Sequence, residues 1–306
     1  MEKFNFKKII SVTISLFIVF LIIYYVKVHW QEFLQIRIVS WQSLTALIFL
    51  MPILFLITAW FFQISLKPYK LQLSFKEYFG LTMTTLMGNY LIPFSGLGVR
   101  AVYMKKVYQF SYRHFLTTVI VSWITNFLVY ALAGIFALII LYLKTRQMNL
   151  TLTIIFLIVF LVSLCSFIPF KVSSKNKTIV RFISTLLLWQ GYIKNRKIIA
   201  KLFYLTICQF LVAAFSFYFA YLAFGFKITF VDSFLPTALS LYSSVIRIVP
   251  ASLGFYELAV VYPSKVIGLS IADGLLISAI TRAATIFWTF ALGLLFGYIL
   301  FRHKEQ

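Results

Sequence analysis

The chain has 306 residues, of which 62% are hydrophobic and 11% are charged, and its mean hydropathy is +0.97. Soluble domains are roughly half apolar and about a quarter charged, so this composition excludes a soluble enzyme, a disordered chain and a nucleic-acid-binding protein. The 28 Lys and Arg residues, against 7 Asp and Glu, give a net charge of +21. They lie in short runs between apolar segments, where a membrane protein meets the lipid headgroups. We therefore predict an all-α, polytopic membrane protein.

Six apolar segments are long enough to cross a bilayer, which takes about 20 helical residues. The first follows Lys3, Lys7 and Lys8 and lacks a small-residue cleavage site, so we expect an uncleaved span and not a signal peptide. The segments leave no room for a separate soluble domain, and residues 1–306 are expected to form a single integral membrane domain. The six predicted crossings are 9–28, 42–66, 116–143, 150–170, 202–224 and 274–301.

Two further apolar regions are too short to cross the bilayer, and each ends in a proline- and glycine-containing break. Residues 80–94 end in the motif Ile-Pro-Phe-Ser-Gly-Leu-Gly-Val-Arg, which spans 92–100. Residues 234–249 end in the motif Val-Pro-Ala-Ser-Leu-Gly-Phe-Tyr-Glu, which spans 249–257. An apolar segment of about 10–14 residues is more often re-entrant than spanning. We therefore predict two re-entrant broken-helix elements. Ordinary kinks, which transmembrane helices tolerate, are the alternative.

The two broken regions also resemble each other, which predicts an inverted repeat of residues 75–143 and 230–301. In such repeats the broken helices of the two copies enter from opposite faces and form a binding site near the bilayer midplane. The aligned positions are Leu97-Gly98 with Leu253-Gly254, each a few residues after a proline (Pro93 and Pro250), Ser111 with Ser270, and Trp123 with Arg282.

The distribution of Lys and Arg predicts the orientation of the chain. If both broken regions are re-entrant, then the amino terminus, residues 67–114, the basic loop 171–201 and the carboxyl tail share one side. That side carries 20 Lys and Arg residues and the other side carries seven. Because cytoplasmic loops carry the excess of these residues, both termini are expected in the cytoplasm. The basic loop is expected to place a helix on the membrane face.

Charged side chains at the two breaks are the candidate binding residues. An ionisable group within a bilayer costs about 2.5–3.5 kcal/mol on insertion scales, so it usually faces a cavity or a partner. Arginine presents a fork of donors that binds phosphate through two hydrogen bonds, and free N–H groups at helix starts add to the preference for anions. The predicted substrate-binding residues are Arg100, Arg247, Glu257 and Arg282, with Gly98, Gly254, Pro93 and Pro250 at the breaks.

These polar residues also have structural interpretations. Glu257 and Arg282 could form an ion pair that only holds the repeats together, or Glu257 could carry a proton. Arg100 could be a snorkelling residue at the cytoplasmic surface. Asn89 and Asn126 lie in apolar surroundings, and we expect both to form hydrogen bonds between helices.

No metal or cofactor motif is evident in the sequence. The three histidines are far apart, and Cys165 and Cys208 lie within apolar runs, as small hydrophobic core residues do. No Gly-x-x-x-x-Gly-Lys-Ser/Thr loop is present, so we expect no nucleotide cofactor. Any transport would then follow a gradient or be coupled to protons or to the membrane potential.

Two segments resemble characteristic elements of the lysylphosphatidylglycerol synthase transmembrane-region family, which are flippase-like membrane proteins. Residues 89–100, Asn-Tyr-Leu-Ile-Pro-Phe-Ser-Gly-Leu-Gly-Val-Arg, are similar to the first element. Residues 249–257, followed by Gly268-Leu-Ser and Arg282, are similar to the second. The resemblance covers about 70–300. It implies a bacterial or archaeal cytoplasmic (inner) membrane protein with two re-entrant elements that moves or presents lipids.

The sequence departs from the family pattern in three respects. It has no aminoacyltransferase domain, so lysine transfer to lipid is not expected. Ser122-Trp123 stand where the family often has a Glu-Arg pair. Pro250-Ala251-Ser252 replace a Pro-Gly-Gly run. These changes argue against a substrate and mechanism identical to those of the bifunctional enzymes.

The predicted function is translocation of an anionic phospholipid or a polyprenyl-phosphate-linked lipid across the cytoplasmic membrane, without enzymatic activity. Anionic membrane lipids are the expected partners. One alternative is a membrane-embedded transferase acting on a lipid-linked substrate, which would need a pair of carboxylates. The other is a non-catalytic partner that recruits a lipid-modifying enzyme through its basic cytoplasmic face. The sequence does not predict an oligomeric state.

Overall fold

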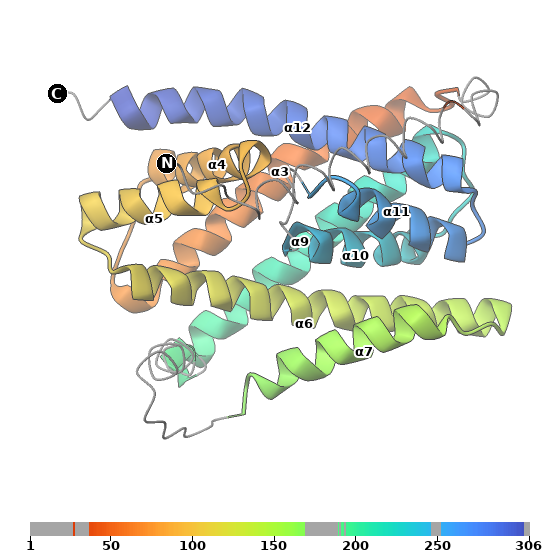
Figure 1. Ribbon diagram of the computed structural model, residues 1–306, viewed down its shortest axis with the longest axis horizontal. Coiled ribbons are helices and arrows are strands. Elements are labelled where there is room, and N and C mark those ends of the chain that lie inside the picture. Colours follow the sequence, from red (N-terminus) through yellow and green to blue (C-terminus); the bar gives the residue numbers. More distant parts are fainter. Residues whose placement is uncertain are drawn as a thin grey trace, which may run out of the picture.

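A computed structural model describes residues 27, 37–168, 189, 191–192, 194–245 and 252–302. Over these residues the protein is all-helical, with nine α-helices and no strand (Figure 1). Residues 9–26 of the first predicted crossing and residues 171–188 of the basic loop lie outside the described residues. The same holds for Arg247 and Pro250.

Four helices are long and apolar enough to cross a membrane, as predicted for four of the six segments. They are α3 (Trp41–Leu66), α6 (Tyr112–Thr145), α9 (Arg196–Ala223) and α12 (Ile271–Arg302). At about 1.5 Å per residue, each exceeds the roughly 30 Å of a bilayer's hydrocarbon core. Helices α6 and α12 run along the long axis of the molecule, and α3 and α9 cross obliquely between them (Figure 1).

The fifth predicted crossing, at 150–170, forms a shorter helix than expected. Helix α7 (Leu150–Cys165) has 16 residues, or about 24 Å, and Ser166–Ile168 continue as turns. Neither cysteine is buried in the core: Cys165 is exposed and Cys208 is half-buried, and both are free thiols. The sequence expectation of two core cysteines was wrong because both apolar runs are partly on the outer surface of the helix bundle.

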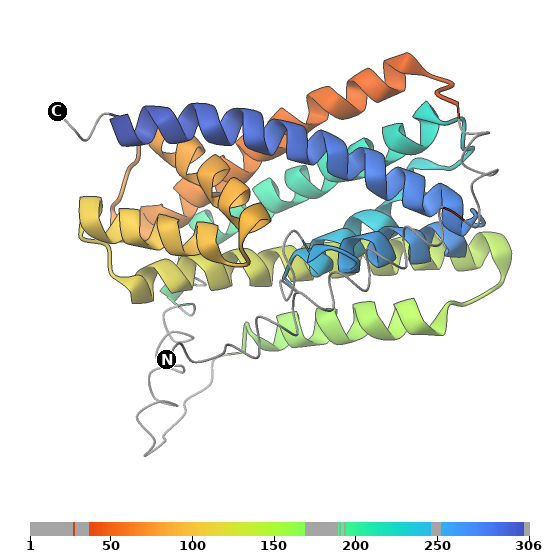
Figure 2. The same ribbon diagram turned by 45° about the horizontal axis from the view of Figure 1, so that its top comes forward.

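Two helical hairpins enter the bundle from opposite ends of its long axis, as both ribbon views show (Figures 1 and 2). Helices α4 (Phe75–Leu91) and α5 (Ser95–Tyr108) form one, and α6 follows it. Helices α10 (Phe234–Val245) and α11 (Phe255–Val266) form the other, and α12 follows it. A short 3-10 turn (Phe230–Ser233) precedes α10. Each hairpin helix is shorter than the long helices beside it, and both hairpins point toward the middle of the molecule.

Local sequence explains why the first hairpin turns where it does. The residue before a proline is sterically pushed out of the helical region, and Ile92, which precedes Pro93, is extended with φ −137° and ψ 130°. Phe94 then adopts a left-handed conformation, with φ 62°, directly before α5. A bulky residue with positive φ is uncommon. Helix α4 therefore ends at Leu91, and the chain starts a new helix after three intervening residues.

The helices that follow the hairpins begin at positions that were matched when the two broken regions were compared with each other. Ser111 caps α6 by accepting a hydrogen bond from the His114 amide. Ser270 precedes α12 and accepts a hydrogen bond from the Asp273 amide at 3.1 Å. Trp123 and Arg282 are each the twelfth residue of their helix. The hairpin glycines do not match: Gly254 directly precedes α11, but Gly98 is the fourth residue of α5.

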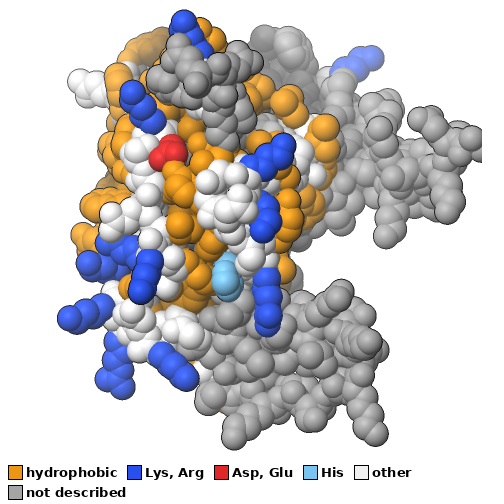
Figure 3. Space-filling view, turned by 90° about the vertical axis from the view of Figure 1, so that its left-hand side faces the viewer, with side chains coloured by type: hydrophobic (Ala, Val, Ile, Leu, Met, Phe, Trp, Pro, Cys, Tyr) orange, Lys and Arg blue, Asp and Glu red, His pale blue; other side chains and the backbone are white. Residues whose placement is uncertain are grey.

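One end of the molecule is strongly basic, and Figure 3 views it directly. This end contains the starts of α4, α6 and α9 and the ends of α3, α5 and α12. Among the described residues, Glu77 is the acidic residue at this end. The opposite end has fewer cations, Arg37, Lys144, Arg146, Lys227 and Lys265, together with Asp232 and Asp273. The described cations of the basic end are Lys67, Lys70, Lys76, Lys105, Lys106, Arg113, Lys194, Arg196, Lys197, Lys201 and Arg302.

Candidate functional site

A cavity of about 400 Å³ lies between the hairpins and the long helices, and eight of the nine described helices contribute to its wall. This volume is within the range of small-molecule binding sites. The wall combines aromatic and aliphatic side chains with many hydroxyl and amide groups. Two arginines, Arg100 and Arg282, line it, and no Asp or Glu from the described part of the chain does. A cavity with cationic donors and without acids favours an anionic ligand.

Arg100 of α5 is half-buried in this wall, and no acid among the described residues pairs with it. Its Nε and Nη2 atoms are buried and have no hydrogen-bond partner among the described residues. The guanidinium carbon lies 3.1 Å from the centre of the Phe62 ring of α3, so a cation–π contact is its principal interaction there. This placement differs from the snorkelling interpretation, because two guanidinium nitrogens are buried in the cavity wall and do not reach the surface.

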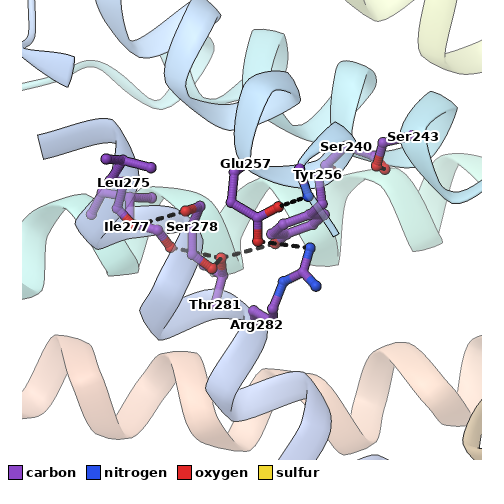
Figure 4. A network of polar contacts seen from close by, with 10 residues as sticks. Ser240, Ser243, Tyr256, Glu257, Leu275, Ile277, Ser278, Thr281 and Arg282 are labelled. Carbon is purple, nitrogen blue, oxygen red and sulfur yellow. Dashed lines mark hydrogen bonds and ion pairs between the residues drawn. The ribbon is translucent and has the colours of Figure 1, made fainter. Parts of the chain in front are cut away.

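Arg282 of α12 is ion-paired, in contrast to Arg100. Its Nη2 lies 2.9 Å from Oε1 of Glu257 on α11, and both side chains are largely buried, with 12% and 13% of their surface exposed. The other carboxylate oxygen of Glu257 accepts a hydrogen bond from the Gly254 amide at 2.6 Å. The guanidinium also lies 4.7 Å from the centre of the Tyr256 ring. Figure 4 shows these groups converging from α11 and α12.

The Tyr256 hydroxyl extends this network to the cavity wall. It is 2.9 Å from the hydroxyl oxygen of Thr281, the residue before Arg282. Tyr256, Thr281 and Arg282 all line the cavity, whereas Glu257 lies behind them and does not. The ion pair therefore fixes the second hairpin to α12 and holds the Arg282 guanidinium at the cavity surface.

Close backbone contact holds the first hairpin together at its turn. A Cβ atom at Gly96 would overlap the Thr85 carbonyl, and one at Gly88 would lie 2.8 Å from the Gly96 Cα. The Gly96 amide donates to Oδ1 of Asn89 at 3.1 Å, and the Ser95 hydroxyl donates to the Gly88 carbonyl at 2.7 Å. These contacts position α5, and with it Arg100, against α4.

The open end of the same hairpin is held by a hydrogen bond between its first and last turns. The Tyr108 hydroxyl donates to Oε1 of Glu77, and Oε2 of Glu77 accepts from the Ser74 amide and hydroxyl. Burial acts to raise the pKa of Glu77, but the hydrogen bonds from Tyr108 and Ser74 outweigh it, and the net pKa is lowered. Burial and the contact with Glu77 raise the pKa of Tyr108. The carboxylate is thus charged at neutral pH and links α4 to α5.

The structure brings some of the predicted site residues together and separates others. Arg100 and Arg282 line one cavity, and Glu257 and Gly254 support Arg282. Gly98 is exposed, and a Cβ there would meet nothing within 4 Å. Pro93 ends α4 but does not line the cavity, and Arg247 and Pro250 lie outside the described residues.

The prediction for the two asparagines was right for Asn89 and wrong for Asn126. Asn89 bonds the Gly96 amide of the neighbouring helix. The Asn126 amide nitrogen lies 3.4 Å from Ser122 Oγ in its own helix, and its Oδ1 is buried without a hydrogen-bond partner. Both side chains line the cavity, but Asn89 also lies at the close contact between α4 and α5, where it meets the Gly96 amide.

Several residues of the site were not found from the sequence. Phe62 and Tyr256 are two of many aromatic residues, and only the fold places them against the arginines. Gly88 and Gly96 flank the break in the sequence, and their eight-residue spacing is the one feature that could have indicated a close contact. Ser122 and Trp123, which depart from the family pattern, both line the cavity.

Comparison with known protein families shows a match over most of the chain. The family model described as Lysylphosphatidylglycerol synthase TM region matches residues 8–293. No curated protein and no solved structure matches the chain.

Proposed function

Because the chain belongs to the lysylphosphatidylglycerol synthase transmembrane-region family, we propose that it translocates an anionic lipid across the cytoplasmic membrane. The lipid is a phospholipid or a polyprenyl-phosphate-linked lipid. The observation that carries the proposal is the cavity that contains Arg100 and Arg282 and no acid from the described residues. Buried arginines in a membrane protein usually face a partner or a pathway, and a phosphate oxygen is the acceptor that a guanidinium fork binds best.

The two arginines occupy different depths along the long axis, which suits a substrate that moves between leaflets. Arg282 lies about 18 Å along α12 from the less basic end. Arg100 contacts Phe62, which is four residues from the end of α3 on the basic side. In this proposal the two hairpins are re-entrant elements of an inverted repeat, and a phosphate group passes from one guanidinium to the other between them.

The charge distribution supports an orientation for this process. The basic end would face the cytoplasm, in agreement with the positive-inside rule, and both termini would lie on that side. The membrane would be the cytoplasmic (inner) membrane of a bacterium or an archaeon. A lipid headgroup arriving from the cytoplasmic leaflet would then encounter Arg100 before Arg282.

The proposal is tested by reconstituting the full chain in vesicles and following a fluorescently labelled phosphatidylglycerol as it becomes accessible from the other leaflet. Arg100→Met and Arg282→Ala are each expected to slow movement at least tenfold, because losing a hydrogen bond to a charged group costs about 1.5–3 kcal/mol. Lys105→Met is the matched control, since Lys105 is exposed on the same helix as Arg100. It is expected to move lipid at the wild-type rate.

Equal rates for the wild type, Arg100→Met and Arg282→Ala would refute the proposed site. A covalently altered lipid after incubation with a donor would instead favour the transferase alternative. A stably co-purifying lipid-modifying enzyme, with no lipid movement by the isolated chain, would favour the non-catalytic alternative.

A further inference from the structure

Three side chains of the cavity wall have buried polar atoms without a hydrogen-bond partner in the described part of the chain. They are Nε and Nη2 of Arg100, Oδ1 of Asn126 and the Thr289 hydroxyl. The three side chains come from α5, α6 and α12. Buried polar atoms in folded proteins are nearly always paired, so this combination indicates which complementary groups a ligand would bring.

The unpaired atoms require two different kinds of ligand group, a hydrogen-bond acceptor and a hydrogen-bond donor. The Arg100 nitrogens only donate, so they require an acceptor, and a charged one compensates the buried cation best. Oδ1 of Asn126 only accepts, so it requires a donor. The Thr289 hydroxyl can donate or accept. A bare phosphate diester satisfies Arg100 but offers Asn126 no donor.

The donor that pairs with Asn126 is better supplied by a neutral hydroxyl than by an ammonium group. An ammonium buried in an apolar cavity is costly unless an acid compensates it, and no described Asp or Glu lines the wall. Glu257, the nearest acid in sequence to the wall residues of α11, is already bonded to Arg282 and to the Gly254 amide. Hydroxyls, in contrast, suit a wall that also presents Ser122, Ser240 and Ser243.

We infer that the cavity binds a phosphate-linked polyol, a glycerol or sugar attached through a phosphate. It binds this group in preference to a bare phosphate or an amine-bearing headgroup. The inference deepens the proposed function and rests on it for the assumption that the ligand is a lipid. The same chemistry would also be presented by a soluble glycerol or sugar phosphate.

The test is a binding measurement that does not depend on transport. The purified full chain is titrated in neutral detergent with dioctanoyl phosphatidylglycerol, phosphatidic acid and phosphatidylethanolamine, and with soluble glycerol 3-phosphate. Apparent affinities are obtained from the concentration dependence of the unfolding temperature. Phosphatidylglycerol is expected to bind at least about tenfold more tightly than the other two lipids, since phosphatidic acid lacks the glycerol hydroxyls of the headgroup and phosphatidylethanolamine carries an ammonium in their place. Charge alone would favour phosphatidic acid.

Variants of the cavity residues distinguish the contribution of the ligand hydroxyl to binding from that of the phosphate. Asn126→Leu and Thr289→Val are each expected to weaken the binding of phosphatidylglycerol about tenfold. They are expected to change the affinity for phosphatidic acid by no more than about twofold. Arg100→Met is expected to weaken the binding of both lipids to a similar extent. Asn126→Asp supplies an acid and is expected to lower the preference for phosphatidylglycerol over phosphatidylethanolamine. Thr206→Val is the matched control, because Thr206 is fully buried and bonds the Leu202 carbonyl, but does not line the cavity.

Phosphatidic acid binding as tightly as phosphatidylglycerol would overturn the inference, and so would equal effects of Asn126→Leu on both lipids. Lipid movement in vesicles without any headgroup preference would overturn it while leaving the proposed function intact. A clear preference for phosphatidylglycerol without transbilayer movement would support the inference and refute the proposed function. Stabilisation by glycerol 3-phosphate alone would support the polyol-phosphate chemistry and identify a soluble ligand.

Discussion

The two cavity arginines differ in how their charge is compensated. Arg282 has a carboxylate at 2.9 Å and an aromatic ring beside it, whereas Arg100 has a ring and no ion-pair partner in the part of the chain that the structure describes. A cation–π contact contributes about 0.5–2 kcal/mol, which is less than the cost of burying an isolated charge. Arg100 is therefore the cation whose burial a ligand would compensate most. Arg282 gains less from an anion, because Glu257 already competes for it.

The Glu257–Arg282 pair is expected to be strongly coupled in a double-mutant cycle. Breaking a buried pair leaves one uncompensated charge and costs about 3–5 kcal/mol. Glu257→Gln and Arg282→Met should each lower the unfolding temperature. The double variant should lose less stability than the sum of the losses in the two single variants.

Lys144 and Asp232 provide the comparison for this cycle. They are 3.7 Å apart, and 45% of the lysine side chain is exposed, so their coupling should stay below about 1 kcal/mol. Additive effects at Glu257 and Arg282 would show that the pair does not hold α11 to α12.

At the scale of elements, the packing of α4 against α5 in the first hairpin depends on Gly96 and not on Gly98. Sequence alignment singled out Gly98, which lies in open space on α5. Gly96, two residues earlier, packs directly on the backbone of Thr85 and donates to Asn89. Because successive positions on a helix face different directions, a shift of two residues moves a glycine from the interface to the surface.

Gly96→Ala and Gly98→Ala form a matched pair that tests this packing. Alanine at position 96 would force α4 and α5 apart, and overpacking of this kind costs about 1–3 kcal/mol or more. Alanine at position 98 removes a helix-interior glycine from open space and should raise stability by up to about 1 kcal/mol. Unfolding temperatures in detergent measure both effects. Equal temperatures for the two variants would contradict the close contact.

At the scale of the whole molecule, the hairpins enter from opposite ends, and the charge is concentrated at one of them (Figures 1 and 3). The end that carries Lys105, Lys106 and Arg113 has few acids to offset them. The other end has Asp232, which lies 3.7 Å from Lys144. An asymmetry of this kind orients membrane proteins, because cationic loops stay on the cytoplasmic side.

The orientation can be measured by thiol labelling in intact cells. In a variant with Cys165 and Cys208 replaced, cysteine at Lys227 should react with an impermeant reagent added outside. Cysteine at Lys106 should react only after permeabilisation. Both lysines are exposed and lie at opposite ends of the molecule. The reverse labelling pattern would overturn the assigned orientation.

The sequence by itself determined the membrane class, the family resemblance, the four long helices and the breaks, because hydropathy, helix length and proline act locally. It also identified Arg282 as a charge within an apolar span and Arg100 as a candidate binding residue, with surface snorkelling left open for Arg100. Only the tertiary structure decided that Glu257 pairs with Arg282, that Arg100 contacts Phe62, and that Asn126 and Thr289 line one cavity with the two arginines. The Arg100–Phe62 contact and the cavity join helices far apart in sequence, and the geometry of all these contacts depends on how closely the backbones approach, as at Gly88 and Gly96. Residue types and spacing along the chain do not encode that distance.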